Sequence, residues 1–367
     1  MRRDRPGSSV VLVASADDAL LDDLLRLTAV ARVEPFVAHD VASLRRSWST
    51  ARLVVLGDDL AAGLGRAPVR RDHVLLVARH GDRSVLNERA VLVGAEDVVV
   101  LPQSQEWLVD QMAAAAEGPS TGAVAAVLGC RGGAGASTFV AVLAHQAARA
   151  GLSCVAVDCD PLGADLDTLL DTGEQPGLRW PDLAQSRGRL PAEALAAALP
   201  LRGGVCLLSG QRRGRDAAMD GPGLEDEALM PVVQALSRAF DLVIADVPRW
   251  MPGRTRAVVE MSDVVLLVTT ADPRGAASAA RMATSLGAIT PTAQLLVRTG
   301  RSWPADPHEL ADLVDLGLAG ELRHDRRLAS GGHGLDANVG RGLRRAARLV
   351  LSDLATGQQR RSGRAGR

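Results

Sequence analysis

The residues with the clearest chemical potential form a glycine-rich turn between an apolar strand expected at 124–128 and a helix expected at 137–150. Glycines in such a turn let backbone N–H groups converge on phosphate oxygens, and the start of the helix adds a favourable partial charge. A phosphate-binding loop also needs a hydroxyl for Mg²⁺ and a lysine for the β- and γ-phosphates. Ser137 supplies the hydroxyl, but Ala136 stands at the lysine position. The predicted nucleotide-binding residues are Arg131, Gly132, Gly133, Ala134, Gly135, Ala136, Ser137 and Thr138.

Carboxylates follow two other predicted strands. Asp158 and Asp160 come after the strand at 154–157 and place two acidic side chains beside the turn. Asp246 ends the apolar strand at 242–245, in the form of a Walker B segment. A carboxylate in that position holds Mg²⁺ directly or through water. The glycine turn alone is a weak signal, and the acidic strand ends strengthen the prediction of a nucleotide site.

These three features, in this order, resemble the ParA/MinD family of deviant Walker ATPases from about residue 124 to residue 354. The family's loop reads K-G-G-x-G-K-[ST]-T, where this chain has R-G-G-A-G-A-S-T. Residues 157–161 are similar to the family's second acidic motif, and residues 246–248 to the switch after Walker B. Residues 246–249 and the loop alanine are closer to the CpaE/TadZ branch, above all to actinobacterial CpaE-like septum-site-determining proteins.

The resemblance implies that ATP with Mg²⁺ binds between two subunits, with residues 132–138 on the phosphates. It also implies that Ser137, Asp160 and Asp246 surround the magnesium ion, directly or through water. In an active member, Asp160 would orient the attacking water. The resulting homodimer would recruit or block protein partners in a division or secretion machine.

Three departures from the family pattern affect this chemistry. Arg131 replaces the signature lysine, which reaches the partner subunit's nucleotide, and an arginine differs from lysine in reach and geometry. Ala136 removes the second lysine, and Arg298 stands where the family often has an adenine-contacting asparagine. We therefore expect nucleotide binding with weak or absent hydrolysis. The alternative is a pseudo-ATPase in which the loop is only structural.

The chain-wide pattern predicts an α/β protein with two parallel sheets, because short apolar runs alternate with helical patterns. We expect a receiver-like, flavodoxin-like domain, followed by a P-loop NTPase-type mostly parallel sheet with helices on both faces. The expected boundaries are a flexible start at 1–8, the receiver-like domain at 9–117, a linker at 118–123, the P-loop domain at 124–356 and a disordered arginine-rich tail at 357–367.

The receiver-like domain lacks the residues of a phosphorylation site. Asp17 and Asp18 could form the acidic cluster after the first strand, but Gly57 occupies the acceptor position, with Asp58 next to it. Ala78 stands where a hydroxyl is expected, and 101–102 reads Leu-Pro where Lys-Pro is usual. We expect a protein-binding pseudo-receiver; a merely stabilising domain and a phosphorelay output acting through Asp58 are the alternatives.

Composition limits the classes of function. The chain has 367 residues, a formal net charge of -1 and no lysine, so all 42 basic residues are arginine. This balance does not favour DNA binding, although Arg202, Arg212, Arg213 and Arg215 could form a basic surface. The four cysteines show no C-x-x-C pair or metal spacing, and no apolar run is long enough to span a bilayer. We expect a cytoplasmic protein, with peripheral contact at the inner face of the membrane left open.

The C-terminal segment 339–354 predicts an amphipathic helix with four arginines outside its apolar stripe. Such a helix either lies on a membrane surface or packs against its own sheet. Taken together, the sequence predicts a positional regulator that acts by nucleotide-dependent dimerisation, with septum-site selection as the first choice. Localisation of a pilus or secretion apparatus and a nucleotide-independent adaptor are the alternatives.

Overall fold

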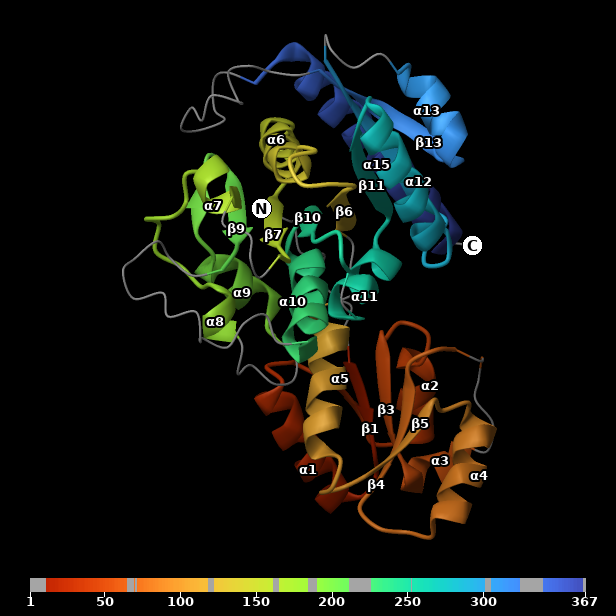
Figure 1. Ribbon diagram of the computed structural model, residues 1–367. Coiled ribbons are helices and arrows are strands. Elements are labelled where there is room, and N and C mark those ends of the chain that lie inside the picture. Colours follow the sequence, from red (N-terminus) through yellow and green to blue (C-terminus); the bar gives the residue numbers. More distant parts are fainter. Residues whose placement is uncertain are drawn as a thin grey trace. The chain divides into compact units, whose positions relative to one another are not determined.

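A computed structural model provides the three-dimensional structure and describes residues 11–64, 69, 71–117, 122–160, 165–183, 190–210, 226–251, 253–300, 305–323 and 339–365. The chain divides into two compact units, Met1–Pro119 and Ser120–Arg367, each of which is described by itself (Figure 1). The expected flexible start at 1–8, most of the expected linker, and Arg212, Arg213 and Arg215 lie outside the described residues.

The N-terminal unit contains one five-stranded parallel sheet with the order β2-β1-β3-β4-β5. Its strands are β1 (Val11–Ala14), β2 (Phe36–Ala38), β3 (Leu53–Gly57), β4 (Val74–Ala78) and β5 (Asp97–Val100). Its helices are α1 (Asp18–Val30), α2 (Val41–Ser47), α3 (Asp58–Leu64), α4 (Arg83–Val93) and α5 (Gln105–Glu117). This strand order is the predicted flavodoxin-like one, in which ligand sites lie at the carboxyl ends of the strands.

Alternating residues of the central strands build two cores, one on each face of this sheet. On β1, Leu12 and Ala14 belong to the core under α2, α3 and α4, whereas Val11 and Val13 belong to the core under α1 and α5. Both faces of the strand are buried, so it reads as a continuous apolar run. This arrangement leaves the strand ends and the turns after them at the surface of the unit.

The C-terminal unit contains an eight-stranded sheet with the order β13-β12-β11-β6-β10-β7-β9-β8. Its strands are β6 (Ala123–Gly129), β7 (Cys154–Asp158), β8 (Leu201–Arg202), β9 (Val205–Leu208), β10 (Leu242–Val247), β11 (Val264–Thr270), β12 (Ala293–Thr299) and β13 (Gly317–Arg323). Every pairing is parallel except β8 with β9. The first strand of the unit, β6, therefore lies at the centre of the sheet, between β10 and β11.

Helices cover both faces of this sheet, as the sequence predicted. They are α6 (Ala136–Arg149), α7 (Asp165–Leu169), α8 (Trp180–Leu183), α9 (Ala192–Ala198), α10 (Asp226–Ala239), α11 (Gly253–Met261), α12 (Pro273–Gly287), α13 (Pro307–Val314) and α15 (Arg341–Ala365). One core contains residues of α6, α7 and α15, and the other contains residues of α8 to α13. On β6 the two sets alternate, with Ala125 and Val127 in the first core and Ala126 and Leu128 in the second.

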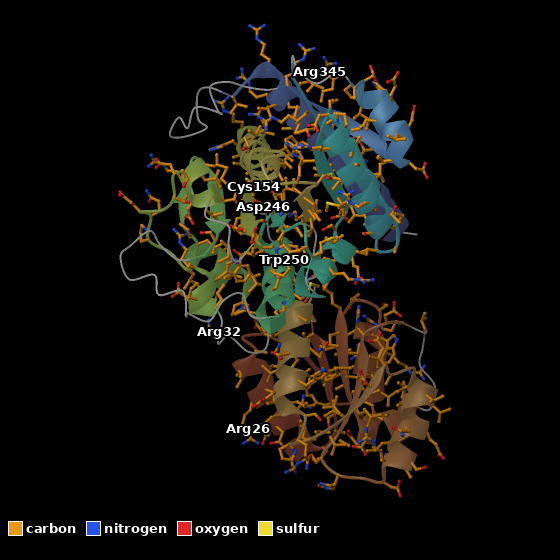
Figure 2. All side chains as sticks on the ribbon, in the orientation of Figure 1. Arg26, Arg32, Cys154, Asp246, Trp250 and Arg345 are labelled. Atoms are coloured by element: carbon orange, nitrogen blue, oxygen red, sulfur yellow. The ribbon has the colours of Figure 1, made fainter. Side chains whose placement is uncertain are left out.

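The C-terminal helix α15 decides between two alternatives and corrects one expectation. The apolar stripe predicted for 339–354, which includes Val339, Leu343, Val350 and Leu354, is buried in the core that it shares with α6, so the segment packs against its own sheet. The helix also continues to Ala365, through residues expected to be disordered. Arg345 projects outward from its solvent face (Figure 2). Within the described residues, no helix combines the length and apolar character needed to cross a bilayer.

Candidate functional site

The glycine-rich turn lies at the carboxyl end of the central strand β6, where it leads into α6. Gly133 and Gly135 have φ angles of +73° and +103°, in the left-handed region that side chains disfavour. The Cys130 N–H donates to the Val268 carbonyl oxygen over 2.9 Å and attaches the start of the turn to β11. The glycines thus allow a tight loop on a rigid strand.

The amino end of α6 is open for an anion. Gly135 is its N-cap residue, and no described side chain caps it with a hydrogen bond. The first N–H groups of a helix lack intrahelical partners and carry a partial positive charge, so they attract phosphate groups. Ser137 and Thr138 lie in this first turn and are half-buried. The turn therefore offers several donors to one anionic ligand.

Three carboxylates gather at the carboxyl ends of β7 and β10. Asp246 pairs in register with Asp158 across these two parallel strands, and the Asp160 N–H donates to Asp158 Oδ1 over 3.0 Å. Burial, and then the negative charge of Asp246, raise the pKa of Asp158 to about 8. Asp158 is only 3% exposed, whereas Asp160 and Asp246 line the neighbouring cleft. Those two side chains are the ones that can reach a cation there.

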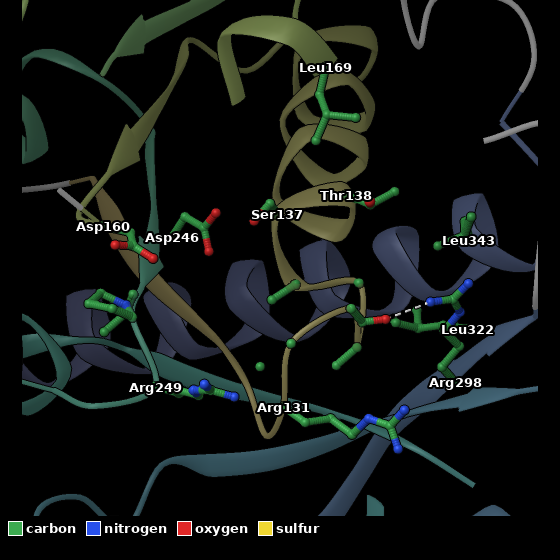
Figure 3. Close-up of a pocket in the computed structure, with 18 of the residues that line it drawn as sticks. Arg131, Ser137, Thr138, Asp160, Leu169, Asp246, Arg249, Arg298, Leu322 and Leu343 are labelled. Atoms are coloured by element: carbon green, nitrogen blue, oxygen red, sulfur yellow. Dashed lines mark hydrogen bonds between the residues drawn. The ribbon is translucent and has the colours of Figure 1, made fainter. Parts of the chain in front are cut away.

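A cleft of about 710 Å³ brings the loop and these carboxylates together. In Figure 3, Ser137, Asp160 and Asp246 lie on one side of the loop, and Arg298, Leu322 and Leu343 on the other. The acidic end suits a magnesium ion. The opposite end, with its leucine side chains, suits a less polar part of a ligand.

Arginines give the cleft its positive charge. Arg298, at the end of β12, donates from Nη1 to the Gly133 carbonyl oxygen over 2.9 Å, and burial lowers its pKa from the ordinary value. Arg131 Nη1 lies 3.3 Å from Asp272 Oδ1, and Asp272 is the N-cap residue of α12. Arg249 and Arg323 also line the cleft. Cationic side chains therefore surround a loop that has no lysine.

The helix α7 forms a further wall of the cleft through Thr168 and Leu169. Its Asp167 forms an ion pair with Arg179, Nη2 to Oδ1 at 3.4 Å, and also accepts hydrogen bonds from Ser209 and Thr172. Arg179 is only 3% exposed, so the pair lies in the interior. These bonds hold the wall to the body of the unit.

The structure brings all of the predicted site residues to this one cleft. Arg131 to Thr138, Asp160 and Asp246 all line it. The sequence predicted no role in this site for Arg249, Arg323 or Asp272. The Asp-Pro pair at 272–273 is a recognisable signal for the start of a helix, so Asp272 could have been predicted as an N-cap residue. The ion pair between Asp272 and Arg131 leaves no such signal in the sequence.

The cysteine thiols are expected to be inert in the folded chain. All four cysteines are buried, and burial raises the pKa of Cys130, beside the loop, to about 11 and that of Cys154 to about 12. Because the thiolate is the reactive form, we expect labelling by a maleimide at pH 8 to be about 100-fold slower than for a free thiol. Mass spectrometry of labelled native and urea-unfolded chain measures this. Rapid native labelling of Cys130 would contradict the prediction.

Comparisons with known proteins follow the same division of the chain. The family model "Rv3660c-like, CheY-like N-terminal domain" matches residues 14–123, and the model "Cellulose biosynthesis protein BcsQ" matches residues 123–297. The protein of Mycobacterium tuberculosis called "Uncharacterized protein Rv3660c" is 38% identical over 359 residues, which cover 95% of this chain and 99% of that protein.

Solved structures show the fold of the C-terminal unit. The ParA family ATPase of Chlorobium tepidum has a TM-score of 0.53 at 16% identity, covering 62% of this chain and 98% of that one. The cell division ATPase MinD of Pyrococcus furiosus has a TM-score of 0.52 at 16% identity, covering 63% and 99%. MinD of Pyrococcus horikoshii, solved with Mg-ADP, has a TM-score of 0.51 at 18% identity, covering 62% and 95%.

These findings confirm the predicted ParA/MinD-like fold and the receiver-like N-terminal domain. The identity to the mycobacterial protein extends over both units and nearly the whole of each chain. The chain therefore belongs to the Rv3660c-like family and joins a CheY-like N-terminal domain to a domain with the ParA/MinD-type ATPase fold.

Proposed function

We propose that this chain is a nucleotide-dependent positional regulator of the ParA/MinD class, which binds ATP with Mg²⁺ and acts by dimerisation. The observation that carries the proposal is the uncapped start of α6, behind two left-handed glycines, in one cleft with Ser137, Asp160 and Asp246. A triphosphate with its magnesium ion is the ligand that matches donors at one end and carboxylates beside them.

The hydroxyl and carboxylate side chains that line the cleft fit a magnesium ion whose other ligands are the phosphates of a nucleotide. No group of three His, Cys, Asp or Glu side chains in the described ranges could hold a metal by itself. Mg²⁺ commonly takes only one or two carboxylates and completes its shell with water and substrate phosphates. Ser137 and Asp246, with Asp160 directly or through water, would hold the ion, and backbone N–H groups of 132–138 would hold the phosphates.

Weak or absent hydrolysis follows from Ala136. Its methyl group brings no charge to the phosphates, and the two arginines that contact the loop or its neighbouring helix cap are already engaged. Arg298 contacts the loop carbonyl of Gly133, and Arg131 pairs with Asp272. These arginines raise the positive potential of the cleft, but neither occupies position 136, where the family has its lysine. The cleft is therefore better suited to hold a nucleotide than to stabilise the charge of a transition state.

Isothermal titration of Mg-ATP into the full chain, together with light scattering, tests this proposal. We expect saturable binding, a shift from monomer to dimer, and little phosphate release. Asp246→Asn and Ser137→Ala should weaken binding in the presence of Mg²⁺, and Asp160→Ala should abolish any turnover. Asp241→Asn, at the other end of β10, is the matched control and should leave binding unchanged. If the native chain does not bind Mg-ATP, the proposal is wrong and the nucleotide-independent adaptor is the remaining alternative.

Trp250 is expected to report the nucleotide. It lines the cleft directly after Arg249 and is 55% exposed, whereas Trp48 and Trp180 are buried. A ligand in the cleft would reduce its contact with water, so its emission should move to shorter wavelength when Mg-ATP binds. Fluorescence titration measures the shift, and Trp250→Phe should remove it while the calorimetric affinity stays similar. If Trp250→Phe shows the same shift, another tryptophan gives the signal and the prediction is wrong.

For the cellular role, we propose septum-site selection in the cytoplasm. It is supported by the ParA/MinD-type fold and by the likeness of residues 246–249 and the loop alanine to CpaE-like proteins. A localisation factor for a pilus or secretion apparatus has the same support from the residues. Overexpression separates them: filamentous cells favour division control, and normal cells with mislocalised pili or secretion complexes favour the alternative.

A further inference from the structure

The carboxyl edge of the N-terminal sheet holds an internal carboxylate where a receiver has its phosphorylation site. Asp59, in the first turn of α3, accepts a hydrogen bond from the Ala16 N–H over 2.6 Å and one from the Asp17 N–H over 3.2 Å. The buried Ser15 hydroxyl donates to its other oxygen over 3.1 Å. These three donors belong to the turn between β1 and α1 and converge on one anion.

Gly57 makes room for this carboxylate. A Cβ atom at Gly57, the expected acceptor position, would lie 2.3 Å from Asp59 Oδ1 and 3.1 Å from atoms of Leu20 and Ser15. A side chain at position 57 and Asp59 in its present place therefore exclude each other. The space that an acceptor aspartate would take is occupied by a carboxylate that comes from two residues later in the chain.

The neighbouring Asp58 makes different contacts. Its Oδ2 atom lies 3.1 Å from Arg89 Nη1 in α4, an ion pair with both side chains partly exposed. The two adjacent carboxylates therefore differ in role, because Asp58 pairs with a side chain of another helix while Asp59 satisfies backbone N–H groups of the β1–α1 turn. Of these two carboxylates, Asp59 is the one on which three donors of a single turn converge, which is the arrangement of a carboxylate-binding nest.

We propose that Ser15, Ala16 and Asp17 form a carboxylate-binding site whose resident ligand is Asp59, and that this ligand keeps the N-terminal unit in one state without phosphorylation. A receiver needs acidic side chains in this turn to bind a metal ion. Here the donors of the turn bind an anion, and the Asp17 carboxylate accepts hydrogen bonds from the Ala19 and Leu20 N–H groups as the N-cap of α1. The place where a receiver gains a phosphoryl group is therefore already filled by a carboxylate of the chain itself.

Hydrogen exchange of the full-length chain, read by mass spectrometry with residue-level fragmentation, tests the site. In Asp59→Ala, the amide of Ala16 should exchange at least about tenfold faster, because it loses a charge-assisted acceptor. The amide of Asp17 should exchange faster by a smaller factor, because its N–H also donates to the Ser15 hydroxyl oxygen over 3.1 Å. Sodium acetate should restore their protection by filling the vacated place, and sodium chloride at equal ionic strength should not. Asp58→Ala is the matched control: it removes the adjacent carboxylate but should leave these amides and their response to acetate unchanged.

Further outcomes decide against the proposal. Unchanged exchange at Ala16 and Asp17 in Asp59→Ala, or an equal effect of acetate and chloride, overturns the site. Phosphorylation of the native chain at Asp58 or Asp59 by acetyl phosphate overturns the permanent state. If Asp59→Ala unfolds the unit, shown by loss of protection in β4, Asp59→Asn decides. It keeps the shape and weakens the acceptor, so faster exchange confined to Ala16 and Asp17 supports the proposal and unchanged exchange refutes it.

Discussion

Replacing Ala136 with lysine is expected to tighten Mg-ATP binding by about 30-fold, because one charge-assisted phosphate contact contributes roughly 2 kcal/mol. Ala136 is the first residue of α6 and lines the cleft, so a longer side chain there extends along the loop. Any hydrolysis should rise further, on the order of 10²–10³-fold, because the added charge acts on the transition state. Calorimetry with ATP and AMP, and phosphate release, measure the two effects.

The matched control is Ala150→Lys, which adds the same charge at the opposite end of α6, where Ala150 is exposed. It should change neither affinity nor turnover. The lysine at position 136 should favour ATP over AMP, since only ATP has β- and γ-phosphates. Equal tightening by both lysines would show a general charge effect. No change in Ala136→Lys, with its fold intact, would mean that the loop does not hold phosphates.

Gly275→Ala is expected to destabilise the C-terminal unit by about 3 kcal/mol, the upper range for overpacking. A Cβ atom at this position would lie 2.1 Å from the Thr270 carbonyl oxygen and 2.5 Å from its hydroxyl oxygen. The clash involves backbone, which cannot move aside as a flexible side chain can. The first turn of α12 must therefore shift away from the end of β11, and with it Asp272, the partner of Arg131.

Gly287→Ala tests the same substitution at the other end of α12, where a new Cβ would meet no atom within 4 Å. Alanine favours helix, so we expect stability within about 0.5 kcal/mol of the native chain, on the stabilising side. Urea unfolding, followed by tryptophan fluorescence and circular dichroism, compares the two variants. Equal stability of the two would contradict the close approach of α12 to β11.

The sequence was sufficient for the parts of the fold that continuous apolar runs encode. The strands of the sheet centres, β1, β3, β4, β6, β10 and β11, are buried on both faces and are apolar up to their carboxyl ends. The glycine loop and the acidic strand ends could also be predicted. The loop leaves a local pattern because its backbone needs glycine, and the carboxylates are recognisable because each follows an apolar strand.

Some edge strands and the distant pairings could not be predicted. β2 has only three residues and is partly exposed, and β13 contains Gly320 and the exposed Glu321, so neither shows a strand pattern. The contact of Arg298 with Gly133 joins residues far apart in the chain, and no spacing rule identifies it. The tail beyond residue 357 was expected to be disordered because it is polar, yet arginine, glutamine and alanine are good helix formers.

The central place of β6 has a consequence for how the protein is made. β6 is the first strand of its sheet to be synthesised, but both of its neighbours come late: Val243 pairs with Val124, and Val264 with Ala125, about 120 and 140 residues further on. In the N-terminal unit, β1 pairs with strands that follow within about 45 residues. Non-local pairing slows folding, and domains fold as units during translation. The nascent N-terminal unit can therefore mature early, while the phosphate loop acquires its shape only after most of its own unit has left the ribosome.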